Sequence, residues 1–209
     1  MSKACGAKRF TLVAIAAAVS LAGATAQAST PGEAAQRVVR ATADDVIAVL
    51  KDTSLSPDEK RERITTVVDQ RFDFMTLSRL VMARNWSKLS QEQQAQFVAE
   101  FRRHLSITYG KNVENYRDEK VVIIGDREEA RGDWTVKTIV ERPTAENVKV
   151  DYRLRQRDGE WKMIDMIVEG VSLVANFRDQ FKEVLARGGP EELLEQLRAK
   201  NAAGPVGAS

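Results

Sequence analysis

Residues 148–181 (VKVDYRLRQRDGEWKMIDMIVEGVSLVANFRDQF) contain the pattern that decides the fold. In the first half, apolar and charged residues alternate, which is typical of a strand with one buried face and one face in water. Asp158 and Gly159 tolerate positive φ and predict a tight hairpin turn. The return segment, 161–168, is largely apolar on both faces, and after Gly170 the apolar spacing becomes helical. Two strands and a helix are therefore expected to enclose one apolar volume, which is the candidate functional site.

Four strands and two C-terminal helices are expected in the second half of the chain. The strands are predicted around residues 121–124, 134–140, 148–154 and 161–168, all joined in antiparallel order. Gly188-Gly189 ends the helix that follows them, and Pro190 begins another.

Helical patterns occupy the chain before residue 120. Ser56-Pro57-Asp58-Glu59 and Ser90-Gln91-Glu92-Gln93 are capping boxes that mark two helix starts. The second helix is expected to continue to Tyr116, with Gly110 predicting a bend or a close approach. Further helices are expected over 34–51 and after Asp73, with a loop around Asn85-Trp86.

Helices that precede an antiparallel sheet indicate an α+β fold. We expect a curved antiparallel β-sheet of about four strands whose concave face is covered by helices, with a hydrophobic pocket between them. The domain should span residues 29–201, with a flexible tail over 202–209.

Residues 1–28 have the features of a cleaved secretory signal peptide. The segment begins with three basic residues, Lys3, Lys8 and Arg9. An uncharged apolar run over 10–24 follows, and Ala26-Gln27-Ala28 is a small-x-small cleavage site. The run of about 15 residues is short for a membrane-spanning helix, which needs roughly 20. Secretion with cleavage after Ala28 is therefore expected.

The composition of the mature chain excludes several classes of function. The one cysteine, Cys5, lies in the leader, so disulfides, thiolate catalysis and cysteine metal sites are excluded. The whole chain has a formal charge of +2, and loss of the three leader cations leaves 29 basic and 30 acidic residues, a charge of −1. This balance gives no reason to expect a nucleic acid or an anionic membrane as partner.

Few residues suggest catalysis. His104 is the only histidine and lies beside two arginines, so a solvated position on a helix is expected, and no metal or other cofactor is predicted. Asp165 and Glu169 share one face of an apolar strand. Buried, such carboxylates could serve acid–base chemistry on an apolar substrate, with Asp165 as general base in a small cone-shaped enzyme. Alternatively, they bond backbone groups or cations at the sheet edge, which we consider the better interpretation.

Large apolar residues are abundant at both sheet and helix positions. From their periodicity alone, an ordinary filled core is the better interpretation for any single residue. An apolar ligand cavity and a docking adaptor with a filled core remain open as alternatives.

Three groups of residues together resemble the MlaC family. The first is Gly159-Glu160-Trp161 followed by 165–173 (DMIVEGVSL), and the second is Arg71-Phe72-Asp73-Phe74 with Leu80 and Asn85-Trp86. The third is the run Phe97, Phe101, Leu105, Tyr109-Gly110. Their order and spacing extend the resemblance over residues 34–201.

The resemblance implies a monomeric periplasmic phospholipid carrier and not an enzyme. Its partners would be an outer-membrane lipoprotein–porin complex and the inner-membrane Mla ABC transporter, between which lipid moves to maintain outer-membrane asymmetry. The phospholipid would be cargo, with its headgroup in water. Keeping a chain of about 15 methylenes in water costs roughly 12 kcal/mol, and an apolar cavity removes most of this cost without catalytic groups.

We expect the pocket to be lined by the inward faces of the sheet and of the helices. The candidate lining residues are Leu77, Val81, Phe97, Phe101, Leu105, Val136, Val150, Tyr152, Leu154, Ile164, Met166, Val174 and Phe177.

Overall fold

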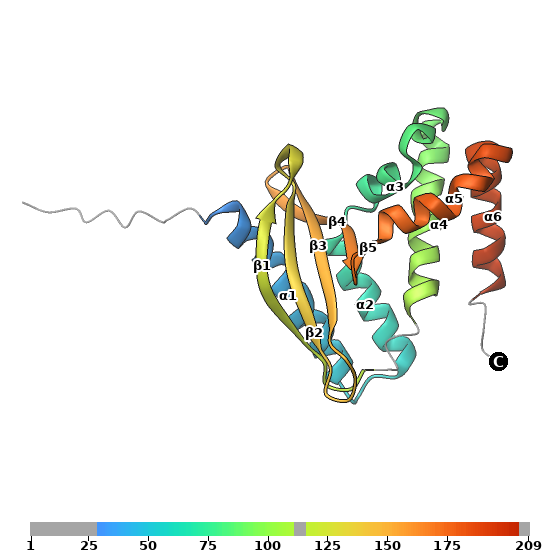
Figure 1. Cartoon of the computed structure of the whole chain (residues 1–209). Coiled ribbons are helices and arrows are strands. Elements are labelled where there is room, and N and C mark those ends of the chain that lie inside the picture. Colours follow the sequence, from blue (N-terminus) through green and yellow to red (C-terminus); the bar gives the residue numbers. More distant parts are fainter. Residues whose placement is uncertain (1–28, 111–115, 205–209) are drawn as a thin grey trace, which may run out of the picture.

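The computed structural model describes residues 29–110 and 116–204 and shows an α+β fold. Helices precede and follow one five-stranded antiparallel sheet (Figure 1). The first half consists of α1 (Pro31–Lys51), α2 (Pro57–Arg71), α3 (Phe74–Met82), the 3-10 helix η1 (Ala83–Lys88) and α4 (Gln91–Tyr109). The second half consists of β1 (Lys120–Glu128), the 3-10 turn η3 (Ala130–Gly132), β2 (Trp134–Glu141), β3 (Val148–Arg157), β4 (Glu160–Val168), β5 (Val171–Ser172), α5 (Leu173–Arg187) and α6 (Gly189–Ala203).

Polar side chains fix the helix starts. The capping boxes of α2 and α4 form as predicted, with Ser56 and Ser90 accepting from the backbone N–H groups of Glu59 and Gln93. Asp73 caps α3 through the N–H of Thr76. These bonds satisfy N–H groups that have no partner within the helix.

The strands form a meander in the order β1-β2-β3-β4-β5. Asp158 and Gly159 have φ values of 52° and 83°, so the predicted hairpin turn joins β3 to β4. The additional strand is β5, which a second turn through Glu169 and Gly170 folds back onto the end of β4.

Two β-bulges interrupt the sheet register. The pairing of β1 with β2 shifts at Ile124, and the pairing of β4 with β3 shifts at Ile164. Because a bulge bends its strand and increases its twist, these two residues contribute to the curvature of the sheet. On either side of the second bulge, Met163 pairs with Leu154 and Met166 pairs with Tyr152.

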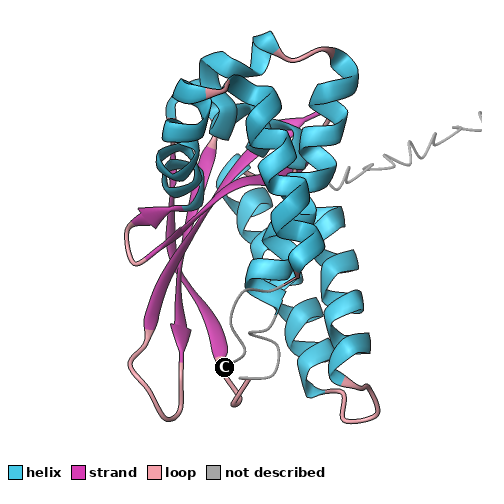
Figure 2. Cartoon of the chain, turned by 90° about the vertical axis from the view of Figure 1, so that its right-hand side faces the viewer, coloured by secondary structure: helices cyan, strands magenta, loops and turns pink. Residues whose placement is uncertain are grey.

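The buried residues form two separate cores. In the sheet core, α1 packs against the strands through Ala35, Val39, Val136, Leu154 and Met163. The helix core joins α3, α4, α5 and α6. Figure 2 shows the sheet on one side of the molecule and the long helices on the other. The single apolar volume expected from the sequence is therefore divided into two cores.

The structure corrects three expected boundaries. The segment around Asn85-Trp86 is the 3-10 helix η1 and not a loop. Helix α4 ends at Tyr109 and Gly110 is its C-terminal cap, so Tyr116 lies outside this helix. Helix α6 reaches Ala203, two residues into the expected tail.

Some predictions fall on parts of the chain outside the described residues. They are the leader 1–28, residues 111–115 of the expected long helix, and the end of the tail, 205–209. None of the described helices has the length and apolar character needed to cross a bilayer.

Candidate functional site

An apolar cavity with two chambers lies between the sheet and the first helices. The sheet chamber, of about 300 Å³, lies between α1 and the strands β1 to β4. Its lining residues on α1 follow an i, i+3, i+4 stripe, so one face of this helix forms a wall. The residues that line the sheet chamber are Val39, Thr42, Ala43, Val46, Ile47, Leu50, Tyr116, Glu119, Val121, Val140, Tyr152 and Met163.

The helix chamber, of about 290 Å³, lies against stripes of α2 and α4. The start of α3, the start of α5 and the inner face of β3 and β4 complete its wall. The residues that line the helix chamber are Thr42, Val46, Arg61, Ile64, Thr65, Val68, Asp69, Phe72, Phe74, Leu77, Arg102, Leu105, Ser106, Tyr109, Gly110, Tyr152, Met163, Met166 and Leu173.

Four residues line both chambers and form the junction between them. Thr42 and Val46 lie one turn apart on α1, and Tyr152 and Met163 come from β3 and β4. The bulge at Ile164 places Met163 on the same face of the sheet as Tyr152. The two chambers therefore adjoin at these shared wall residues, and each is near the lower end of the size range of small-molecule sites, about 300 Å³.

All three tyrosines of the chain line this cavity. Burial raises the pKa of Tyr152 to about 12, because the phenolate would lose its hydration at the junction. Burial also raises the pKa of Tyr109. The pKa of Tyr116 is raised by burial and, in addition, by the negative charges of Asp118 and Glu119. These hydroxyls therefore remain neutral at physiological pH.

The charged groups of the helix chamber are paired with one another or with groups at its rim. Arg102 of α4 forms an ion pair with Asp69 of α2, and its guanidinium lies 5.9 Å from the centroid of the Phe74 ring. Arg61 forms an ion pair with Asp58 one turn earlier in α2. The rest of the surface is dominated by aliphatic and aromatic side chains, which suits a hydrocarbon ligand.

Four of the thirteen predicted lining residues lie on the cavity: Leu77, Leu105, Tyr152 and Met166. The other nine are buried but line neither chamber. Five belong to the helix core, namely Val81, Phe97, Phe101, Val174 and Phe177. Val136 and Leu154 belong to the sheet core, and Val150 and Ile164 are buried in the strands outside both clusters.

Helical geometry explains why Phe97 and Phe101 were misplaced. Residues four apart advance by about 40° around a helix, since each residue turns by about 100°. The series from Phe97 to Tyr109 therefore begins in the helix core, where the Phe101 and Phe177 rings are 5.0 Å apart, and ends at the cavity. For Ile164 the reason is the bulge, which made Met163 the inward residue.

Most of the cavity wall was not predicted from the sequence. A weak signal exists on α2, where Ile64 and Val68 have i, i+4 spacing, although the helix has no fully buried residue. The helix over 34–51 was expected, but its stripe that includes Val46 was not predicted to be part of the site. Phe72 and Leu173 lie in segments that carry the family resemblance, but neither was predicted as a wall residue. The former pairs with Met163 in an isolated parallel bridge, and the latter opens α5.

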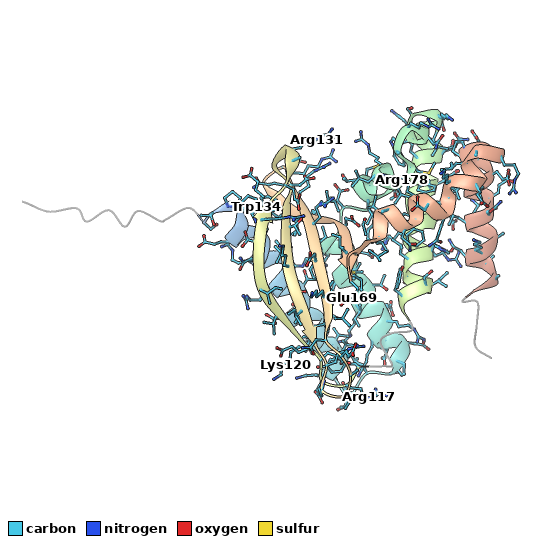
Figure 3. All side chains as sticks on the ribbon, in the orientation of Figure 1. Arg117, Lys120, Arg131, Trp134, Glu169 and Arg178 are labelled. Atoms are coloured by element: carbon cyan, nitrogen blue, oxygen red, sulfur yellow. The ribbon has the colours of Figure 1, made fainter. Side chains whose placement is uncertain are left out.

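The carboxylates of Asp165 and Glu169 accept hydrogen bonds, mainly from backbone N–H groups. This agrees with the structural interpretation of the pair and not with the catalytic one. Asp165 is 2% exposed and accepts hydrogen bonds from Met166 N (2.9 Å), Ser172 Oγ (2.6 Å) and Val174 N (3.1 Å). Glu169 lies at the β4–β5 turn, and its carboxylate accepts from Lys149 N (Figure 3). Neither residue lines a chamber.

His104 is half-buried, contrary to the solvated position expected. Its Nδ1 lies 3.2 Å from Asn201 Oδ1, and its ring packs edge-on against Phe177. Burial lowers the pKa of His104, which the bond to Asn201 partly offsets. Within the described residues, no group of three or more His, Cys, Asp or Glu side chains could hold a metal ion.

Comparisons with known proteins agree on one family. The model of the family described as "MlaC protein" matches residues 40–199. A curated relative, the toluene tolerance protein ttg2D of Pseudomonas putida, is 26% identical over 170 residues, which cover 79% of this chain and 77% of that protein. A solved structure of a phospholipid-binding protein from Ralstonia solanacearum, in complex with a phospholipid, has 31% identity and a TM-score of 0.73. That match covers 81% of this chain and 97% of the other.

Proposed function

Since the chain belongs to the MlaC family, we propose that it binds phospholipids by enclosing their acyl chains in the two-chamber cavity. The observation that carries the proposal is the predominantly apolar lining of two adjoining chambers. The Ralstonia solanacearum relative, whose structure contains a phospholipid, supports the same ligand class.

The energetics favour a carrier that needs no catalytic group. A chain of about 15 methylenes gains roughly 12 kcal/mol when it leaves water, at about 0.8 kcal/mol per methylene. Both chambers together offer two apolar volumes of similar size, which suits a ligand with two hydrocarbon chains. The carboxylate of Asp165 is engaged in three hydrogen bonds away from the cavity, so we propose a binding protein and not an enzyme.

The headgroup should remain in water at the rim of the helix chamber. Arg61 and Arg102 lie there, but both already form ion pairs, with Asp58 and Asp69. A paired cation offers less attraction to a phosphate than a free one, so we propose that headgroup identity contributes little to affinity.

We further propose that the protein works in the periplasm as a monomer. It would carry phospholipid between an outer-membrane lipoprotein–porin complex and an inner-membrane ABC transporter, and so help to maintain outer-membrane lipid asymmetry. The signal-peptide pattern of residues 1–28 supports export, and the apolar cavity supports passage of lipid through water.

Mass spectrometry of lipids extracted from the purified mature protein tests the ligand. The full chain is expressed with its leader, purified from the periplasm and extracted with organic solvent. We expect phospholipid in about equimolar amount to protein, whereas a protein that carries no phospholipid under these conditions would refute the proposal.

Transfer between vesicles tests the carrier role separately. Donor vesicles with a fluorescent phospholipid are mixed with acceptor vesicles across a dialysis membrane that passes the protein but not vesicles. Protein-dependent arrival of label in the acceptors is expected. If the protein binds lipid but transfers none, the proposed binding site stands and the proposed carrier role is refuted.

A further inference from the structure

The hydroxyl of Tyr152 has a position that packing alone does not explain. Tyr152 lies on the inner face of β3 and lines both chambers. Within the described part of the chain, its hydroxyl makes no hydrogen bond to another protein group, and it is not among the fully buried polar atoms that lack a partner. The hydroxyl is therefore accessible from the cavity, where a ligand atom can take the place of water as its hydrogen-bond partner.

Of the four junction residues, Tyr152 is the one with an unused donor. Val46 and Met163 offer no side-chain donor there, and the hydroxyl of Thr42 donates to Val38 O at 2.7 Å. The directly paired residues of the neighbouring strands, Val136 and Met166, are also apolar. Among the four junction side chains, Tyr152 is therefore the one that can donate a hydrogen bond to a ligand atom.

A two-chain phospholipid has one place where its hydrocarbon chains meet. At that place the glycerol carries two ester groups, and their carbonyl oxygens accept hydrogen bonds but cannot donate them. If each chain occupies one chamber, the point where the chains diverge coincides with the point where the chambers meet. The polarity also matches, since a donor on the protein faces an acceptor on the lipid.

We infer that the Tyr152 hydroxyl donates a hydrogen bond to an ester carbonyl of the bound phospholipid and thereby favours ester-linked over ether-linked lipids. This inference rests on the proposed function, because it assumes that the cavity holds phospholipid. Tyr152 would then determine specificity for the bond that links each hydrocarbon chain to the glycerol. This specificity is independent of the chain lengths and of the headgroup.

The test compares two phospholipids that differ only in linkage. Diester and diether phosphatidylethanolamine with identical chains compete against a fluorescent lipid for the delipidated full mature protein. The wild type should bind the diester lipid about tenfold more tightly, because the ether oxygen is a weaker acceptor and leaves the hydroxyl unpaired. Tyr152→Phe, which removes only the hydroxyl, should bind both lipids with equal affinity.

Thr108→Val is the control for removal of a hydroxyl. Thr108 is exposed on α4 and lines neither chamber, so its variant should keep the wild-type preference. Equal binding of both lipids by the wild type, or a preference that survives in Tyr152→Phe, would overturn the inference while the proposed function stands. Binding of neither lipid would overturn both.

Discussion

The carboxylate of Asp165 joins the end of β4 to the start of α5. It accepts the N–H of Val174 in the first turn of α5 and the hydroxyl of Ser172, the N-cap residue of that helix. A buried carboxylate on an apolar strand suggests chemistry from the sequence alone, because its partners lie seven and nine residues away. The three bonds instead indicate that it fixes the entry of α5 into the fold.

Asp165→Ala should therefore lower the free energy of unfolding by about 2 kcal/mol, since it leaves buried donors without an acceptor. Urea denaturation measures the change. Asp165→Asn keeps an acceptor oxygen and should lose less. Phospholipid bound per folded molecule should be normal in both variants, and a well-folded Asp165→Asn protein that cannot bind lipid would contradict the structural role.

His104 makes the stability depend on pH. Because the folded state has a lowered pKa, the unfolded chain binds this proton more readily than the native protein does. The contribution of neutral His104 to the free energy of unfolding is fully present above the pKa of the unfolded chain, about 6.5. It is lost as the pH falls below that value.

The prediction is tested by urea denaturation at several pH values between 8 and 5. His104→Gln, which can still reach Asn201, should show a smaller loss of stability over this range than the wild type. The difference between the two proteins isolates His104 from the carboxylates, which titrate at lower pH. If the free energy of unfolding falls equally with pH in the two proteins, the pH dependence does not come from His104 in its position between α4 and α6.

At the scale of single elements, Gly159 in the β3–β4 turn has a backbone requirement. Its φ is +83°, and no atom lies within 4 Å of the position that a Cβ would occupy, so a side chain would meet strain but no clash. Gly159→Ala should destabilise the protein by about 1 kcal/mol.

Gly110 provides the matched control for this substitution. Its φ of −64° suits any residue, and an added Cβ would make an ordinary contact of 3.6 Å with Arg61. Gly110→Ala should leave the free energy of unfolding unchanged or slightly higher. Equal destabilisation by both substitutions in urea titrations would contradict the positive-φ requirement.

Local signals allowed the elements to be predicted well. Capping residues such as Ser56, Asp73 and Ser90 act on backbone groups within three residues, so the chain shows them directly. The bulge at Ile164 could not be predicted, because it depends on how β4 pairs with β3. A bulge reverses which residues face inward, so the predicted inward position of Ile164 belongs to Met163.

At the scale of the whole molecule, the site depends on which helix faces meet. Four wall residues could be predicted: Tyr152 and Met166 on strands, Leu105 near the end of a helical series, and Leu77 on the apolar face of α3. The stripes of α1 and α2 contribute more of the wall, but nothing in one sequence shows that these two stripes face the cavity. The family resemblance was accessible from the sequence, and with it the expectation of an apolar pocket, while the walls of the cavity required the tertiary structure.

Filling the junction should abolish lipid binding. Val46 lines both chambers and is half-buried on α1, so Val46→Phe would place an aromatic ring where the chambers meet. We expect at least tenfold less co-purified phospholipid with near-wild-type thermal stability, since the ring occupies existing space. Ala48→Phe, on the exposed side of the same helix, should bind lipid normally. Equal lipid content in both variants would place the ligand outside the cavity.

A crystal structure of the mature protein purified with its own lipid tests the central claim most directly. We predict continuous density for hydrocarbon in both chambers, with the chains meeting beside Tyr152 and the headgroup at the rim near Arg102. Chambers that contain only water or collapsed side chains, with phospholipid bound elsewhere on the protein, would contradict the account.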